Sequence, residues 1–539
     1  MSELRSMIER YSQDKEALER FYDVPHSRVS IDRRRSFAES WGEALSELGF
    51  EGLGVDGRVD YHLLQNHLDG ELANREVEES RLTEVTEVLP FLPDLVRLEE
   101  DRRAMARLGS EETGRRLGEI AVRVAQTAEA LDPEESSASP SLPRLERARQ
   151  ALEAVLPLLK SWRTHYAGYR PEFDWWLRAP YRKVRKGLKS CLKAVKARLD
   201  DDQLVGDPIG RPALERAIGH QYIPYGPEDL IAMGERQMAW CTERMLEVSR
   251  ELGCGDDWKA ALEKVKDRHE PLGRQHELVE DLAREAIEYV DEHVLVTVDA
   301  LCRETWTIDM IDQEGQKRLP FLGYGGQKIL VSYPTRGMDL EAAQMAVRAN
   351  NEHFTRAVTH HELIPGHHLQ IYMAQRHRAY RQVFRTPFLS EGWCLHWELL
   401  LWDRGFARGP EDRVGMLFWL MHRCARIGVS LRFHLGEMSP DEMVDHLVEQ
   451  VGHERDAARS EVRRYIGDAY GPLYQCAYMI GALQMRALYR ELVTEGELGD
   501  RDFHDAVLRQ GPIPIELLRA GLRRELLAPD HRASWEFGG

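Results

Sequence analysis

The chain has 539 residues, with 73 Lys and Arg against 91 Asp and Glu, which gives a net charge of −18. Its 42% hydrophobic and 30% charged residues are typical of a globular protein and exclude disordered and fibrous classes. The negative charge argues against sequence-independent binding to nucleic acid or to an anionic membrane, so we expect neither as a partner.

The first residues, MSELRSMIERYSQDKEALERF, carry charges throughout and lack the apolar core of a signal peptide. No uncharged apolar stretch has the length that a transmembrane helix needs. The seven cysteines are scattered without a CxxC pair, a pattern typical of reduced thiols rather than of a disulfide framework or a Cys-based zinc site. Together these features predict a cytoplasmic protein.

Most of the chain predicts helix. Residues 76–131 have apolar positions three and four apart, as in long amphipathic helices, and residues 132–143 (DPEESSASPSLP) predict a linker or a long surface loop. The run 178–198 contains nine Lys and Arg and no acid. It could bind nucleic acid or lipid, but leucines and valines at helical spacing favour a solvated helix face.

Further along, residues 206–212 predict a break, and residues 225–230 open a helix with acids in its first turn. A third irregular zone covers residues 320–337. Within it, residues 327–333 (QKILVSY) are rich in β-branched and aliphatic residues and bounded by Gly and Pro, which predicts a short strand and suggests an exposed edge of a sheet.

Residues 359–370 read THHELIPGHHLQ and place four histidines and one glutamate within nine residues. Each buried imidazole needs a hydrogen-bond partner, so a bound metal explains this cluster better than core packing does. In the zinc-protease pattern HExxH, two histidines at i and i+4 share a helix face and the glutamate is the general base. His361 and Glu362 match the start of that pattern, but Pro365 stands where the second histidine is expected.

On a straight helix, His367 would point roughly 120° away from His361, whereas His368 would lie about 10 Å farther along the axis. Neither could then share one ion with His361 at Zn–N distances of about 2.1 Å. Pro365 disrupts helical hydrogen bonding and Gly366 tolerates unusual dihedral angles. A kink or wide turn at this pair can bring a second histidine back, which leaves His367 and His368 as alternatives.

The segment HHELIPGHHLQ resembles the HExxPGHH motif of DUF885, a family of bacterial proteins similar in fold to helical zinc metallopeptidases of the gluzincin type. Four further segments resemble motifs of that family in the same order: 389–398 (EGWALYxE), 461–465 (ExxRY), 478–481 (YxxG) and 503–511 (FHxxxLxxG). The resemblance implies a mainly α fold, a large helical metallopeptidase-like body with a small β-sheet and a central active-site cleft. Residues 1–205 would form a helical region that covers the cleft and residues 206–539 the catalytic region, within one continuous body.

The resemblance implies that His361, His367 and Glu391 bind zinc and that Glu362 is the catalytic base. Two neutral imidazoles and one carboxylate leave a coordination position for water, whose pKa zinc lowers to about 7. Ser390 is a candidate N-cap that would place Glu391 in the first turn of a helix.

Three residues are candidates to support these ligands: His360, His368 and Glu398. Glu398 lies two turns after Glu391 on the same helix face. It can orient a ligand histidine, or it can be a salt-bridged acid at the edge of the core, and the sequence favours neither.

Other residues are candidates for substrate contacts. His434, Tyr465 and Tyr478 could stabilise an oxyanion, although each residue type is also common as a satisfied core residue. Another four are candidates for substrate binding, the arginines as forks for a carboxylate: Arg423, Arg426, Arg464 and Tyr474. The predicted strand 327–333 is a candidate to bind the substrate backbone.

The chain departs from the family pattern at three positions. Ser430 and Arg432 replace the Asp and Gly of a D-T-G-x-H segment that ends at His434, and Tyr474 replaces a glutamine. These changes leave the metal motif intact and concern substrate specificity.

Three functions follow as hypotheses. The first is a zinc-dependent hydrolase of peptide or peptide-like amide bonds in small substrates, in which Glu362 activates the zinc-bound water. The second is a related metalloenzyme specialised for one small metabolite or conjugate of a biosynthetic pathway, which the three departures suggest. The third is a non-catalytic helical metal-binding scaffold, which Glu362 disfavours because a structural zinc site needs no base.

Overall fold

The computed structural model describes residues 3–133, 139–199, 203–316, 319, 321–467 and 470–538. Helices make up 71% of the structure, beside a three-stranded sheet, so the predicted mainly α fold is confirmed. The chain divides into a larger unit (Met1–Ile8, Phe50–Leu64 and Asp207–Gly539) and a smaller unit (Glu9–Gly49 and Gln65–Gly206). The division at residue 206 lies beside the predicted boundary, while residues 1–8 and 50–64 group with the larger unit. That the N-terminal region covers a cleft stays a prediction.

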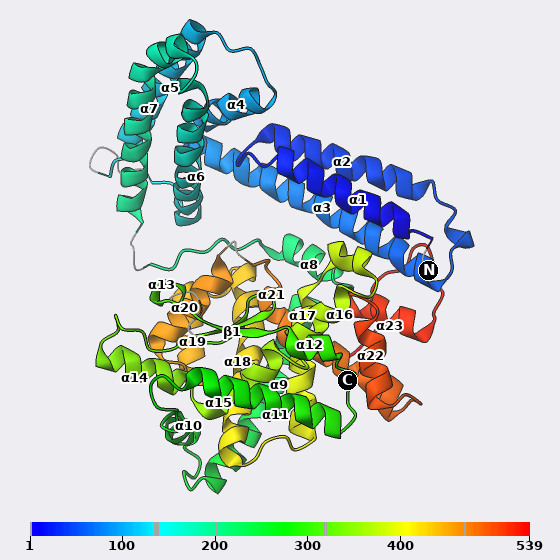
Figure 1. Ribbon diagram of the computed structural model, residues 1–539. Coiled ribbons are helices and arrows are strands. Elements are labelled where there is room, and N and C mark those ends of the chain that lie inside the picture. The colour runs from blue at the N-terminus through cyan, green and yellow to red at the C-terminus, as the bar shows by residue number, and fades with distance from the viewer. Residues whose placement is uncertain are drawn as a thin grey trace. The chain divides into compact units, whose positions relative to one another are not determined.

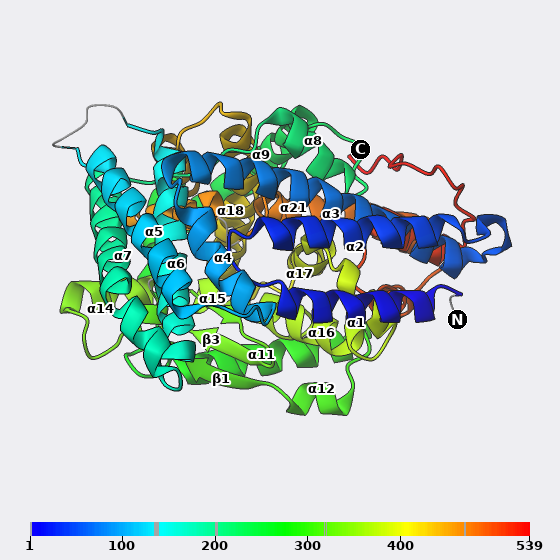
Figure 2. The ribbon, with the colours of Figure 1, turned by 90° about the horizontal axis from the view of Figure 1, so that it is seen from above.

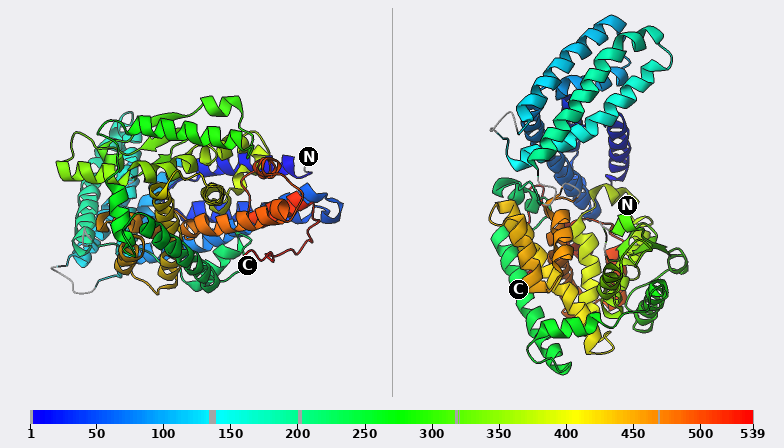
Figure 3. Two further views of the ribbon diagram at one scale, coloured as in Figure 1. Left: turned by 90° about the horizontal axis from the view of Figure 1, so that it is seen from below. Right: turned by 90° about the vertical axis from the view of Figure 1, so that its left-hand side faces the viewer.

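The smaller unit is built from amphipathic helices, which the views of the ribbon show as long rods (Figure 1, Figure 3). It comprises parts of α1 (Arg5–Phe21) and α3 (Val55–Val88), together with α2 (Arg28–Ser46), α4 (Leu92–Arg103), α5 (Ser110–Leu131), α6 (Leu142–Ala167) and α7 (Pro171–Arg198). Helix α7 packs against both α5 and α6 around an apolar core. The helices predicted within residues 76–131 are confirmed. Of the predicted linker, residues 134–138 lie outside the described residues.

Helix α7 contains the basic run. Its apolar residues at helical spacing, among them Leu177, Val184 and Leu188, are buried. Eight of the nine Lys and Arg residues between 178 and 198 are exposed, the exception being the half-buried Arg198. The simpler interpretation, a solvated helix face, is therefore the one that the structure shows.

Two helices of the larger unit, α17 (Pro387–Asp403) and α18 (Pro410–Leu435), are buried along most of their length. The helices of this unit are α8 (Arg211–Gly219), α9 (Pro227–Glu251), α10 (Trp258–Lys266), α11 (Gln275–Glu292), α12 (Ala300–Glu304), α13 (Gln313–Gln316), α14 (Leu340–Ala349), α15 (Glu352–Glu362), α16 (His367–Ala374), α17, α18, α19 (Pro440–Val451), α20 (Arg455–Ile466), α21 (Tyr474–Tyr489), α22 (Asp500–Leu508) and α23 (Ile515–Arg523). Short 3₁₀ segments cover Phe50–Gly52 and Ala379–Phe384, and Arg490–Thr494 form a π-helical turn. Helix α9 begins where the sequence predicts, with Glu228 and Asp229 in its first turn.

Helix α18 is buried along almost its whole length and packs against α9, α15 and α21. Helix α17 packs closely against α21. At their contact a Cβ atom on Gly392 would lie 2.4 Å from the backbone carbonyl carbon of Gly481, so both helices need glycine there. This backbone contact joins the middle of α21 to the second turn of α17.

The small sheet has the strand order β1-β3-β2, and β1 and β3 run side by side in Figure 2. Strand β3 (Lys328–Val331) pairs in parallel with β1 (Thr307–Met310), where Thr307 lies opposite Lys328. It also pairs antiparallel with β2 (Gly323–Tyr324). The strand predicted at residues 327–333 is therefore confirmed, but the prediction of an exposed edge is wrong. Ile329 and Val331 are fully buried, and β3 is the central strand.

Polar contacts attach residues 50–64 to the rest of the larger unit. The Nε atom of Arg381 donates to Asp60 at 2.7 Å, and both side chains are fully buried. Arg378 donates twice to Asp56, at 2.8 and 3.0 Å. None of the described helices has both the length and the apolar character that a bilayer-spanning segment requires.

Candidate metal centre

The turn predicted at Pro365 and Gly366 separates α15, which ends at Glu362, from α16, which begins at His367. The Ile364–Pro365 peptide bond is cis, and the indole of Trp393 on α17 donates to the carbonyl of Pro365 at 2.8 Å. A Cβ atom on Gly366 would lie 1.8 Å from the carbonyl oxygen of His361. Only glycine therefore allows the chain to turn this tightly against the end of α15.

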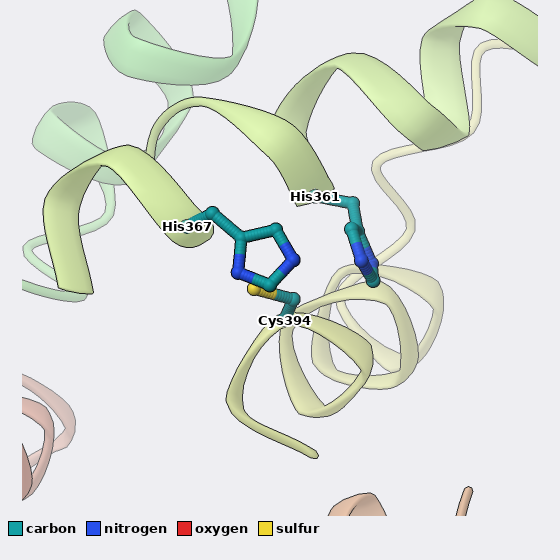
Figure 4. Close-up of side chains that lie close together, drawn as sticks. All are labelled: His361, His367 and Cys394. Atoms are coloured by element: carbon teal, nitrogen blue, oxygen red, sulfur yellow. The ribbon is translucent and has the colours of Figure 1, made fainter. Parts of the chain in front are cut away.

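This turn brings His361 and His367 together. Their ring centroids are 5.0 Å apart and the ring planes are nearly perpendicular, and Figure 4 shows the two imidazoles facing one another. Both ring nitrogens of His368 contact other residues. Its Nε2 lies 2.9 Å from the carbonyl of Cys302, and its Nδ1 lies 3.2 Å from the hydroxyl of Tyr324. The structure thus places His367, and not His368, beside His361.

Glu391 comes to the two histidines from α17. Its Oε2 atom lies 3.5 Å from Nε2 of His361 and 3.3 Å from Nε2 of His367. The helix is capped by Thr386, which accepts from the backbone of Phe388, with proline at the first helical position. The expectation that Ser390 caps this helix is therefore wrong, and Glu391 lies one turn deeper in α17.

Glu398 supports His361. Its Oε1 atom lies 2.7 Å from Nδ1 of His361 and accepts from Arg423 at 3.1 Å. Both interpretations of Glu398 thus hold together, since it orients a histidine and is paired with a buried arginine. A carboxylate on Nδ1 holds the ring in the tautomer that leaves Nε2 for a ligand.

Two tyrosines of α21 complete the surroundings. The hydroxyl of Tyr474 donates to Oε1 of Glu391 at 2.6 Å, so this residue holds the carboxylate by the oxygen that does not face the histidines. The ring of Tyr478 stacks on His361, with centroids 6.1 Å apart and an angle of 15° between the planes. His360 lies apart, because its Nδ1 faces the carbonyl of Arg356 at 3.0 Å and its ring meets the side chain of Phe406.

The electrostatics of the cluster favour an ionised Glu391 beside His361. Burial lowers the pKa of His361, but Glu391 and Glu398 outweigh it and raise the pKa to about 9. Burial raises the pKa of Glu391, but His367 and His361 hold that pKa well below its usual range. For Glu362, burial outweighs the attraction of His361 and His367 and raises the pKa.

A cysteine that was not among the predicted site residues also lies here. Donor atoms of Cys394, His361 and His367 all lie within 4.8 Å of one another, and the thiol of Cys394 is fully buried beside the ring of His367 (Figure 4). Burial raises the pKa of this thiol well above its usual value, and the charge of Glu391 adds to the effect. The spacing of three residues between Glu391 and Cys394 on one helix was the signal that could have found it.

The remaining arginines and Tyr465 form a second buried cluster around Glu461. This carboxylate accepts from Arg426 at 3.0 Å, from Tyr465 at 2.9 Å and from Arg464 at 2.8 Å. Arg426 also donates to the hydroxyl of Tyr465 at 2.9 Å. We call these four residues, with His422 and His453 behind them, the Glu461 cluster. Arg464 is the most exposed of its arginines, with 23% of its side chain accessible.

His434 lies eleven residues after Arg423 on α18, about 16 Å along the helix axis. Its ring contacts the neighbouring ring of Phe433. Ser430 donates to the carbonyl of Pro472 at 3.4 Å, and Arg432 pairs with Glu235 at 2.5 Å. These contacts of Ser430 and Arg432 are made with Pro472 and Glu235 and not with the histidine cluster.

The donor set fits a zinc ion. Two donors that each lie about 2.1 Å from a tetrahedral ion are about 3.4 Å apart. The separations of 3.5 and 3.3 Å between Oε2 of Glu391 and the two Nε2 atoms match that value and exceed normal hydrogen-bond lengths. Oε2 is buried without a hydrogen bond of good geometry, whereas Oε1 accepts from Tyr474. His361, His367 and Glu391 would hold the ion.

The sequence model of DUF885, described as a bacterial protein of unknown function, matches residues 19–522. The chain belongs to this family. The family resemblance seen in HHELIPGHHLQ and the four later motifs is thereby confirmed, while the similarity to zinc metallopeptidases stays a prediction.

Two solved structures share the DUF885 fold. One is a protein of unknown function from Shewanella oneidensis, provisionally classed as a lipoprotein, with a TM-score of 0.72 and 16% identity over 96% of this chain and 99% of that chain. The other, also provisionally classed as a lipoprotein, is from Colwellia psychrerythraea, with a TM-score of 0.62 and 16% identity over 97% of this chain and 98% of that one. No curated protein matches the chain. At this identity the likeness concerns the fold alone.

Proposed function

We propose that this DUF885 protein is a zinc-dependent hydrolase of peptide or peptide-like amide bonds in small substrates. The observation that carries the proposal is the convergence of Oε2 of Glu391 on the Nε2 atoms of His361 and His367 at tetrahedral separations. A purely structural role would not require Glu362 beside these donors, because a base has no task in a closed zinc site.

Bound at these donors, zinc supplies Lewis-acid chemistry that lowers the pKa of water and polarises a carbonyl. Glu362 follows His361 directly at the end of α15, where its carboxylate accepts a proton from the attacking water and returns it to the leaving amine. Glu398 and Tyr474 hold His361 and Glu391 in place for this step.

Among the three candidates for oxyanion stabilisation, Tyr478 is favoured, because its ring stacks on His361. The hydroxyl of Tyr465 is engaged by Glu461 and Arg426, and His434 lies far along α18. For a substrate carboxylate, Arg464 is favoured over Arg423 and Arg426, which are buried and paired with Glu398 and Glu461.

The test combines metal analysis with a Glu362→Gln variant. We expect one zinc per chain in both proteins, and amide hydrolysis reduced by about 10²–10⁴-fold in the variant. Glu437→Gln, at an exposed position after the end of α18, is the matched control and retains full activity. A protein without stoichiometric zinc, or a Glu362→Gln variant as active as wild type, would contradict the proposal.

A metalloenzyme for one metabolite is the second candidate. Tyr474 stands at a departure from the family pattern and contacts a proposed ligand directly. Digestion of a broad peptide library separates the two functions, since cleavage of many peptides contradicts the specialised one.

We also propose a cytoplasmic location, with small substrates and neither nucleic acid nor membrane as partner. The seven cysteines, all free thiols, and the net charge of −18 support it. Fractionation of cells that produce the full-length protein tests the location, and recovery in the membrane fraction would contradict it.

A further inference from the structure

Cys394 lies in the wall of the proposed zinc site. Its thiol is fully buried, and its sulfur lies within 4.8 Å of a nitrogen of His361 and of a nitrogen of His367. In the described part of the chain, no other group of three or more His, Cys, Asp or Glu side chains brings donor atoms this close together. The other cysteines lie outside such a group.

Glu391 is a second, independent indication of a ligand site beside His361 and His367. It precedes Cys394 by three residues on α17, so both side chains leave the same face of that helix. Its buried Oε2 atom has no hydrogen bond of good geometry and faces the same two imidazoles. The same two imidazoles therefore have the oxygen of Glu391 and the sulfur of Cys394 within reach.

The separations are within reach of coordination. A Zn–S distance of about 2.3 Å and a Zn–N distance of about 2.1 Å place sulfur and nitrogen about 3.6 Å apart at the tetrahedral angle. Donor atoms that already lie within 4.8 Å of one another reach this separation by small side-chain rotations. Because Gly392 holds α17 tightly against α21, the helix itself need not move.

We propose that Cys394 is the fourth zinc ligand of this chain, together with His361, His367 and Glu391. This proposal rests on the proposed function, because it assigns the coordination position that hydrolysis reserves for water. When the Zn–S bond forms, the thiol proton passes to solvent and the sulfur replaces water on the ion. The thiolate-bound form is a resting state, and hydrolysis requires that water displaces the sulfur.

Cobalt(II) substitution tests the assignment by a signal that does not depend on activity. Wild-type protein loaded with cobalt should show ligand-field bands in the visible and a thiolate-to-cobalt charge-transfer band in the near ultraviolet. Cys394→Ala should keep the visible bands and lose the near-ultraviolet band. Cys191→Ala removes an equally buried thiol in the smaller unit and should keep both.

Zinc X-ray absorption gives a second readout on the wild-type protein, with one sulfur expected at about 2.3 Å. Stoichiometric metal binding without a sulfur signal overturns the assignment of Cys394 and leaves the proposed zinc site standing. Absence of metal binding overturns both. If Cys394→Ala does not fold, Cys394→Ser replaces it, and the wild-type spectrum alone still decides, since it must contain the thiolate band.

Discussion

Two buried clusters of charge contact α18, one through Arg423 and the other through Arg426, and they differ in how their carboxylates are satisfied. In the Glu461 cluster, both carboxylate oxygens accept hydrogen bonds, from Arg426, Tyr465 and Arg464. In the histidine cluster, one oxygen of Glu391 accepts from Tyr474 while the other faces only two imidazoles at more than 3.2 Å. Burial and charge are common to both, so neither property identifies a ligand site.

What distinguishes the two clusters is whether the protein supplies every partner. A buried charged network whose members satisfy each other needs nothing further. Buried donor atoms that face one another without forming hydrogen bonds need a partner from outside the chain. A cation fits two imidazoles and a carboxylate. The Glu461 cluster is therefore expected to stabilise the fold, and the histidine cluster to bind an ion.

The largest expected effect on stability is in the Glu461 cluster. Glu461→Gln leaves the buried guanidinium of Arg426 without its carboxylate, so we expect a loss of roughly 3–5 kcal/mol in the free energy of unfolding. Chemical denaturation measures it. Zinc stoichiometry should not change at a temperature where the variant is folded. Loss of zinc from the folded variant would contradict the assignment of separate roles to the two clusters.

Its control is Glu454→Gln at the N-cap of the same helix. Glu454 is exposed and lies 3.5 Å from Lys266, so the change should stay within about 0.5 kcal/mol.

Gly366→Ala should break the histidine cluster alone. The added Cβ atom would meet the carbonyl oxygen of His361 at 1.8 Å, so the turn between α15 and α16 must open. We expect the variant to lose stoichiometric zinc and about 3 kcal/mol of stability in the larger unit. Metal analysis and denaturation measure the two effects.

Gly118→Ala in α5 is the matched control, because a Cβ atom there meets nothing within 4 Å. It should stabilise the smaller unit by about 0.4–1 kcal/mol. Retention of full zinc content in Gly366→Ala would show that the tight turn does not define the site.

The Glu461 cluster should also make the larger unit sensitive to mild acid. Burial is the main cause that lowers the pKa of His453 to about 4, with Arg426 and Lys266 adding to it against Glu461. Because the folded state holds this histidine neutral, the unfolded state binds the extra proton first, and stability falls as the pH drops from about 6.5 to 4. The loss is roughly 3 kcal/mol for this group.

Unfolding free energies of wild type and His453→Gln, measured across that pH range, test the assignment. The two curves should differ by a constant above pH 7, where His453 is neutral in both states, and converge in acid. Parallel curves throughout would show that His453 titrates normally.

The smallest predicted effect concerns the hydroxyl of Tyr474. Tyr474→Phe removes the hydrogen bond to Oε1 of Glu391 and should weaken zinc binding by about 10–100-fold, with the fold intact. Competition with a chelator measures it. Tyr465→Phe removes a hydroxyl from the Glu461 cluster instead, and an equal loss of zinc affinity in that variant would contradict the separation of the clusters.

Sequence patterns within a single segment predicted the helices, the helix starts and the turns that depend on that segment alone. The helices within residues 76–131 followed from apolar spacing, and the start of α9 from its acidic first turn. The turn at Pro365 and Gly366 followed from backbone constraints on those two residues. The choice between His367 and His368 could not be predicted from the sequence, because it depends on the hydrogen-bond contacts of Cys302 and Tyr324 with His368.

Other features depend on segments far apart in the chain. Strand β3 became central because β1 and β2 pair with it, and no pattern within residues 327–333 shows that. The hydrogen bond from Arg426 on α18 to Glu461 on α20 likewise forms only when these two helices pack together, and Tyr465 donates to the same carboxylate. The place of Cys394 beside the histidines also depends on how α17 packs, and locally only its spacing of three residues from Glu391 indicates it.

The contact between Gly392 and Gly481 has a consequence for the rate at which an ion is acquired. Since α17 is pressed against α21 at backbone distance, the donors on α17 are ordered by folding itself and not by the ion. Little conformational entropy is then lost on binding, so metal uptake by the folded protein should be a single fast phase limited by access to buried donors. A side chain at either glycine would part the helices and turn that uptake into a slow, folding-coupled process.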